Sequence, residues 1–187
     1  AKHGAGLSIV NDNFGLNSNV GLNISYAYRK SLIQGELGIG LGLNMISHSY
    51  DGEWVSLEQG DEAIPKQTDD TPLSFDFNLG LFYRADNLYL SISSRNMANT
   101  TVNWNIEKPP YIGRQVYFAT GYEYQLPNPM FSIEPGAFIA TDFSVTQLSL
   151  SGILTYNKRF YGGLGYRAID AAMVIAGISL PSGIDIA

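Results

Sequence analysis

Few side chains in this chain of 187 residues have the chemistry that catalysis needs, and the histidines are the first to consider. Only His3 and His48 occur, and His48 lies between Ser47 and Ser49. A lipase or protease site needs a histidine within hydrogen-bond reach of a serine or an aspartate. Adjacent residues on a strand face opposite ways, so neither serine can be the direct partner of His48. We therefore expect no catalytic residue and no enzymatic activity.

Cofactor and metal sites have equally weak signatures in this sequence. Gly38, Gly40 and Gly42 recur at every second residue, which places them on one face of a strand rather than in a phosphate-binding loop. The segment 49–71 is rich in carboxylates but lacks the alternating spacing of a calcium-binding loop. We expect no cofactor and no bound metal.

The acidic character of the chain comes from that same segment. The formal net charge is −6, and segment 49–71 alone carries seven carboxylates against one lysine. Its composition is that of a partner-binding or cation-binding loop, although a solvated surface loop has the same composition. The connection 96–113 carries a tryptophan that can anchor a partner or lipid headgroups, or pack under its own loop. The loop residues that we single out for partner binding are Trp54, Asp61, Glu62 and Trp104. A basic footprint for nucleic acid is absent from the sequence.

The elements that must position these side chains are predicted to be strands. From Val20 to Arg29 every second side chain is apolar, and the runs 37–45 and 75–83 repeat this alternation. Weaker examples follow along the chain, and no helical spacing competes over a useful length. We expect about ten strands.

Composition must then decide between a soluble β-sandwich, a soluble barrel and a membrane barrel, because all three alternate. A small soluble barrel fills its interior with large aliphatic side chains and carries charges outside. Here only 15% of residues are charged, and the second face of the strands is mostly Gly, Ser, Asn and Ala. That face suits a polar lumen, and the apolar face suits lipid, where a closed barrel satisfies every backbone hydrogen bond. The sequence therefore predicts an antiparallel up-and-down transmembrane β-barrel.

Charged residues on the small, polar face are predicted to point into the lumen. They either line a pore or hold a plug, or they pair across strands and fill the interior. These lumen-facing charges are Arg29, Glu36, Asp76, Glu123, Glu134 and Arg167.

Tyrosines on the apolar face lie at the C-terminal ends of their strands, as expected where hydrocarbon meets water. The predicted membrane-interface residues are Tyr26, Tyr28, Tyr83, Tyr122, Tyr124 and Tyr156. Each adjoins a tight connection, and tight connections alternate with longer ones at 11–19, 49–71 and 96–113. The tight connections are expected on the periplasmic side and the long ones outside.

The length corresponds to one domain, so residues 1–187 are predicted to form a single outer-membrane barrel domain. The first strand begins abruptly near Ala1, and no final aromatic-ended strand follows Leu180. We therefore expect N-terminal and C-terminal segments to be missing, and the intact barrel to have more strands. No apolar stretch is long enough for a transmembrane helix.

Two parts of the chain resemble a known family. The stretch 4–15, followed by Ser25-Tyr-Ala-Tyr-Arg29, looks like the early strands of the PorP/SprF outer-membrane proteins. The stretches 127–138, 148–156 and 163–177 resemble the C-terminal half of that family, including its Tyr-Arg and Asp-Ala signature at 166–171.

The resemblance implies a Bacteroidota outer-membrane barrel of the type IX secretion system, which exports adhesins and enzymes and supports gliding motility. It implies location in the bacterial cell outer membrane. The implied partners are outer-membrane lipid and either other secretion components or a secreted adhesin, with no nucleic acid. The family has no known catalytic centre from which residues could be transferred. Two other interpretations stay open: an outer-membrane channel or porin for small solutes, and a hydrolase that depends on His48.

Overall fold

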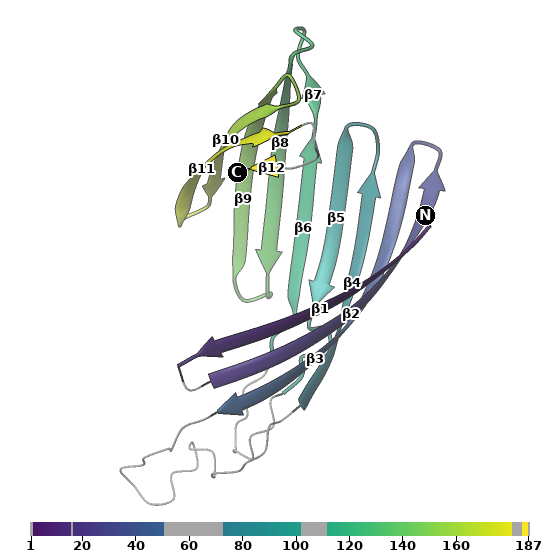
Figure 1. Ribbon diagram of the computed structural model, residues 1–187, viewed down its shortest axis with the longest axis vertical. Coiled ribbons are helices and arrows are strands. Elements are labelled where there is room, and N and C mark those ends of the chain that lie inside the picture. The colour runs from purple at the N-terminus through teal and green to yellow at the C-terminus, as the bar shows by residue number, and fades with distance from the viewer. Residues whose placement is uncertain (1, 16, 51–72, 102–111, 181–184, 187) are drawn as a thin grey trace, which may run out of the picture. The chain divides into compact units, whose positions relative to one another are not determined.

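The protein is described by a computed structural model that covers residues 2–15, 17–50, 73–101, 112–180 and 185–186 (Figure 1). In these ranges the regular secondary structure consists of strands. The strands are β1 (His3–Phe14), β2 (Asn17–Leu32), β3 (Gly35–Tyr50), β4 (Leu73–Arg84), β5 (Leu88–Arg95), β6 (Gln115–Tyr122), β7 (Tyr124–Gln125), β8 (Phe131–Thr141), β9 (Thr146–Tyr156), β10 (Phe160–Arg167), β11 (Ala171–Ser179) and β12 (Asp185–Ile186).

Strands that follow one another in the chain also lie next to one another in the sheet. The order is β1-β2-β3-β4-β5-β6-β8-β9-β10-β11-β12, with β7 paired to β8, and β1 and β12 stand at its two ends. The ladders β1–β2, β8–β9, β9–β10 and β10–β11 are antiparallel throughout. Apart from the two-residue strands β7 and β12, this is the set of about ten strands predicted from the alternation. The up-and-down topology is confirmed.

Burial in the described residues is the reverse of that in a soluble protein. Along β3 the large apolar side chains Ile39, Leu41 and Leu43 are 44–55% exposed. The polar Asn44, which follows Leu43 on the same strand, is 7% exposed. Ser74 and Asp76 on β4 are equally buried, and no large side chain of the described residues is fully buried. Water-soluble proteins bury such apolar side chains and expose such polar ones. Lipid reverses this preference, so the pattern fits the predicted transmembrane barrel and excludes a sandwich core.

The described segments contain no helix with the length and hydropathy to cross a membrane.

One predicted connection is wrong. The long link expected at 11–19 is a tight hairpin, because β1 continues to Phe14 and pairs there with Asn17 at the start of β2. Gly15 takes up the reversal in the left-handed region, at φ 59°. The alternation of apolar residues stops before the β1–β2 ladder ends. Polar residues such as Asp12 continue the ladder, because strand pairing uses backbone groups that every residue but proline has. The link 51–72 lies outside the described residues, and the link between β5 and β6 is described only in part.

A proline explains why β6 and β7 are separate. Gly121 pairs with Gly136 and Tyr124 with Ile133, so the two strands keep one register along β8, with Pro135 in the gap. Proline has no N–H to donate to the ladder. Glu123 lies between β6 and β7, and its N–H donates to the Asn87 carbonyl at 2.7 Å.

The chain divides into two compact units. The first comprises residues 1–29, 39–80 and 94–115, and the second comprises 30–38, 81–93 and 116–187. A single domain over residues 1–187 stays a prediction.

Candidate binding site on the polar face

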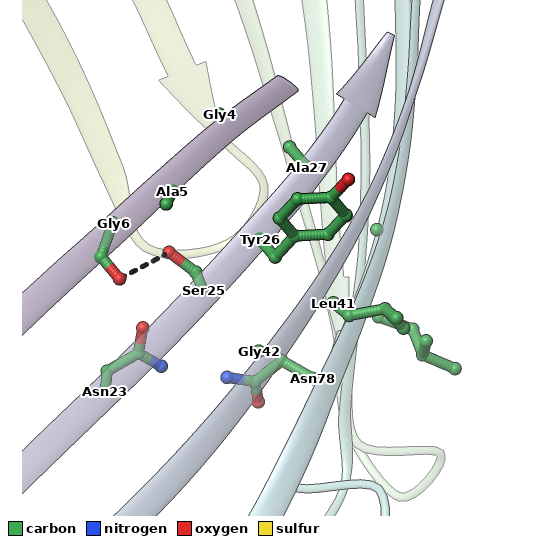
Figure 2. A pocket seen from close by; sticks show the side chains of 13 residues that line it. Gly4, Ala5, Gly6, Asn23, Ser25, Tyr26, Ala27, Leu41, Gly42 and Asn78 are labelled. Atoms are coloured by element: carbon green, nitrogen blue, oxygen red, sulfur yellow. Dashed lines mark hydrogen bonds between the residues drawn. The ribbon is translucent and has the colours of Figure 1, made fainter. Parts of the chain in front are cut away.

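The first unit contains two hollows on the polar face of its strands. The larger has a volume of about 660 Å³ and is lined by Ser8, Val10, Asp12, Asn19, Gly21, Leu22, Asn23, Asn44, Ile46, His48, Asn78, Arg95, Asn96, Ile112 and Gln115. We call it the amide cavity. The smaller, about 420 Å³, shares Asn23 and Asn78 with it and is otherwise lined mainly by small residues of β1–β4. Figure 2 shows this smaller hollow, with Ser25 donating to the Gly6 carbonyl at 3.4 Å across β1 and β2.

Three asparagines form a hydrogen-bonded chain across β2, β3 and β4. Asn23 Nδ2 donates to Asn44 Oδ1, and Asn44 Nδ2 donates to Asn78 Oδ1 at 3.2 Å. The Asn96 N–H also donates to Asn78 Oδ1, at 3.3 Å. Side chains alternate between the two faces of a strand, and each of these asparagines lies on the polar face. All three amides therefore project from the same face of the sheet. Since Asn44 is 7% exposed, its amide needs both partners to offset its burial.

Asp76 holds the segment that follows β5 against β4. Its Oδ1 accepts from the Phe77 N–H at 2.7 Å and from the Ala98 N–H at 2.9 Å. Its Oδ2 lies 3.2 Å from the Thr100 hydroxyl and 3.5 Å from the Thr100 amide nitrogen. A buried carboxylate is stabilised by such donors without a cation. Asp76 therefore anchors a chain segment rather than pairing with another charge.

A second anchor acts on the same segment from the other side. The Arg114 guanidinium donates through Nη2 to the Met97 carbonyl at 2.8 Å, and the Arg114 N–H donates to Asn99 Oδ1 at 2.7 Å. Asn96 and Asn99 have φ of 54° and 51°, a region that asparagine tolerates better than most residues. These bonds hold residues 96–100, of which Asn96 lines the amide cavity.

His48 lines the same cavity and contacts an asparagine side chain. Its Nδ1 lies 2.8 Å from Asn19 Oδ1, and Ser49 Oγ donates to the Ser18 carbonyl at 3.3 Å. An amide oxygen only accepts, so this contact places the proton on Nδ1. The serines beside His48 are thus not its partners, as the strand geometry predicts.

The predicted lumen charges are spread over both units. Asp76 is buried, Arg29 and Glu36 are exposed, and Glu123 and Glu134 line a hollow of about 230 Å³ in the second unit. Arg167 Nη1 lies 3.4 Å from Asp170 Oδ2. The structure therefore brings Glu123 and Glu134 together, and their predicted role in a pore or plug stays a prediction.

The predicted interface tyrosines lie on the exposed face of their strands. Five of them are 37–52% exposed, namely Tyr26, Tyr28, Tyr122, Tyr124 and Tyr156. Tyr83 is less exposed, and its hydroxyl donates to the Gln34 carbonyl at the neighbouring turn, at 3.1 Å. Contact with lipid headgroups stays a prediction for all six. The loop residues Trp54, Asp61, Glu62 and Trp104 lie outside the described residues.

The asparagine chain is the feature that sequence reasoning did not single out. Asn23, Asn44 and Asn78 each appear in the alternation as ordinary members of the small, polar face. The sequence did hold a clue: all three asparagines lie on the polar face of strands that follow one another in an up-and-down sheet. Their alignment depends on the stagger between strands, which alternation alone does not give.

Comparison with known protein families decides the assignment. The family model described as "Type IX secretion system membrane protein PorP/SprF" matches residues 1–187, the whole chain. The chain belongs to the PorP/SprF family. It is thus a type IX secretion system membrane protein, as the resemblance implied. No curated protein and no solved structure matches it.

The Tyr-Arg and Asp-Ala signature of this PorP/SprF protein closes the β10–β11 hairpin. Tyr166 pairs with Ala172 and Arg167 with Ala171. Within the turn, the Asp170 N–H donates to the Arg167 carbonyl at 3.2 Å, and Gln147 Nε2 donates to the Asp170 carboxylate at 3.3 Å. The signature therefore has a structural role at the end of two strands.

Proposed function

We propose that this PorP/SprF protein is a non-enzymatic outer-membrane barrel that assists the export or surface attachment of secreted proteins, such as adhesins, by binding partners. The observation that carries the proposal is the match of a type IX secretion family over the whole chain. The exposed apolar face and buried polar groups support a lipid-embedded location. The amide cavity supports binding, because it is a preformed polar hollow of the size that ligands occupy.

The experiment is deletion of the gene in a bacterium that carries it, followed by mass spectrometry of the surface and supernatant proteins. We expect one or a few secreted proteins to be lost from the surface, and to return when the wild-type gene is restored. The protein purified in mild detergent should carry a secretion component or a secreted protein with it. Unchanged surface and supernatant protein profiles would refute the proposal.

The second candidate is a channel for small solutes, and the polar lining of the amide cavity is the observation that favours it. Conductance of the purified full-length protein in a planar bilayer separates the two candidates. A steady open-pore current with unchanged export would favour the channel. A sealed barrel with altered export would favour the secretion role. Neither candidate uses His48 catalytically, whereas a hydrolase needs it, so unchanged activity of a His48→Ala variant would remove the hydrolase interpretation.

A further inference from the structure

We propose that the amide cavity binds a segment of extended polypeptide through the main-chain groups of that segment. The proposal rests on the partner-binding role proposed above and names the chemistry that the site recognises. All residues that line the cavity belong to the first unit: they come from β1–β4 and from positions 95, 96, 112 and 115.

The asparagine chain leaves one acceptor and one donor unused at its two ends. Asn23 donates through Nδ2 and Asn78 accepts through Oδ1, so Asn23 Oδ1 and Asn78 Nδ2 make no hydrogen bond within the described part of the chain. A primary amide offers two N–H donors and an acceptor oxygen. A peptide group needs one acceptor for its N–H and one donor for its carbonyl. The two free ends of the chain provide both.

The charges and ring content of the lining select against other ligands. Asp12 and Arg95 are the only lining residues with formal charges, so among the described residues the cavity carries no excess of either sign. The lining therefore has no net charge that would favour a cation over an anion or the reverse. Among the described residues the lining contains no Phe, Tyr or Trp ring on which the apolar face of a sugar can stack, and the imidazole of His48 is hydrogen-bonded to Asn19. A neutral chain of amides fits this lining of amide side chains and balanced charges.

Hydrogen bonds within the protein position several groups of the site before a ligand arrives. Asp76 and Arg114 bond the Ala98 N–H and the Met97 carbonyl at 2.9 and 2.8 Å, next to the lining residue Asn96. The buried amide of Asn44 is fixed by both of its neighbours in the chain. Preorganised polar groups bind more tightly, because less side-chain freedom is lost on binding.

Gly21 allows the cavity to be filled without disturbing the strand. A Cβ placed there meets only the Val10 carbonyl oxygen at 3.9 Å and Ile46 Cγ1 at 4.0 Å, both ordinary contacts. A valine side chain at this position therefore fits the backbone and occupies the cavity. Gly152 on β9 offers a matched control in the second unit, because a Cβ there meets nothing within 4 Å.

The test is isothermal titration calorimetry of the full-length protein in detergent. The main probe is the peptide acetyl-(Gly-Ser)5-amide. The second probe is the same peptide with N-methylglycine at every glycine, which removes the backbone N–H from every second residue. The third probe is maltotriose, a neutral sugar. The proteins compared are the wild type, Gly21→Val and Gly152→Val, each first checked for folding by circular dichroism.

We expect saturable binding of the peptide by the wild type and by Gly152→Val. Gly21→Val and the N-methylated peptide should each weaken it by about tenfold or more. Absence of saturable peptide binding, equal binding by Gly21→Val, or binding of maltotriose in place of the peptide would overturn the inference. None of these outcomes changes what gene deletion does to the surface proteins. Failure of the peptide-binding inference is therefore distinguishable from failure of the proposed secretion role.

Discussion

Replacement of Asp76 by alanine should detach residues 96–100 from β4. The side chain is 5% exposed, and its carboxylate accepts from the Ala98 N–H at 2.9 Å and lies 3.2 Å from the Thr100 hydroxyl. Hydrogen bonds to a charged group contribute about 1.5–3 kcal/mol each. The Thr100 hydroxyl keeps a second acceptor, the Phe75 carbonyl at 2.6 Å, so the groups that lose their bond to Asp76 outright are the N–H groups of Phe77 and Ala98 and, at 3.5 Å, that of Thr100. We expect Asp76→Ala to lower the free energy of unfolding by about 2–4 kcal/mol.

The assay is equilibrium urea unfolding of the protein in lipid vesicles, followed by circular dichroism. Asp76→Asn keeps an acceptor oxygen of the same reach and should lose about half as much as Asp76→Ala. Asp86 is exposed in the β4–β5 turn, so Asp86→Ala should change stability by less than about 0.5 kcal/mol. The reasoning fails if Asp76→Ala behaves like Asp86→Ala, or if the asparagine variant loses as much as the alanine variant.

Three further predictions concern the lipid-facing surface, a tight hairpin and a turn. Leu41 is 55% exposed, so Leu41→Arg should destabilise the protein in vesicles by about 2–4 kcal/mol if it lies near the bilayer midplane; a neutral effect in urea unfolding would argue against lipid contact. A Cβ at Gly35 would overlap a facing backbone carbonyl, whereas at Gly40 the closest atom is 3.8 Å away. Gly35→Ala should therefore reduce the yield of folded protein in a refolding assay, and Gly40→Ala should not; equal yields would contradict this. In the β8–β9 turn the N–H groups of Val145 and then Ser144 hold the pKa of Asp142 below its ordinary value. The stability that this carboxylate contributes is complete above its unfolded-state pKa and is lost as pH falls through its folded-state pKa. Carboxyl-carbon NMR titration should show the low pKa, and Asp142→Asn should remove that part of the pH dependence; an ordinary pKa would refute the turn geometry.

Much of the fold could be predicted from the period of the sequence. The alternation from Val20 to Arg29 placed Gly21 and Asn23 on one face and Ile24 and Tyr26 on the other, and their exposure follows it. The ends of the strands were harder to predict, because the hydrogen-bonded ladders continue through polar residues that do not alternate with apolar ones. This is why the hairpin at Gly15 was mistaken for a long link.

The candidate site was predicted less completely. Asp76 was assigned to the polar face, but its partners are backbone N–H groups of residues 98 and 100, which no pattern of side chains reveals. Asn23, Asn44 and Asn78 were on the predicted face without being recognised as a set. Their hydrogen bonds depend on the stagger of three strands.

The sequence by itself determined which face of each strand is apolar, because an alternation of period two and a low charge content follow directly from the order of residues. It also carried the family, through a match that covers the whole chain. Only the tertiary structure decided which polar groups meet, because hydrogen bonds form between particular atoms about 3 Å apart, whereas a residue pattern specifies faces and not distances. The asparagine chain, the Asp76 anchor and the cavity beside them belong to that second kind of information.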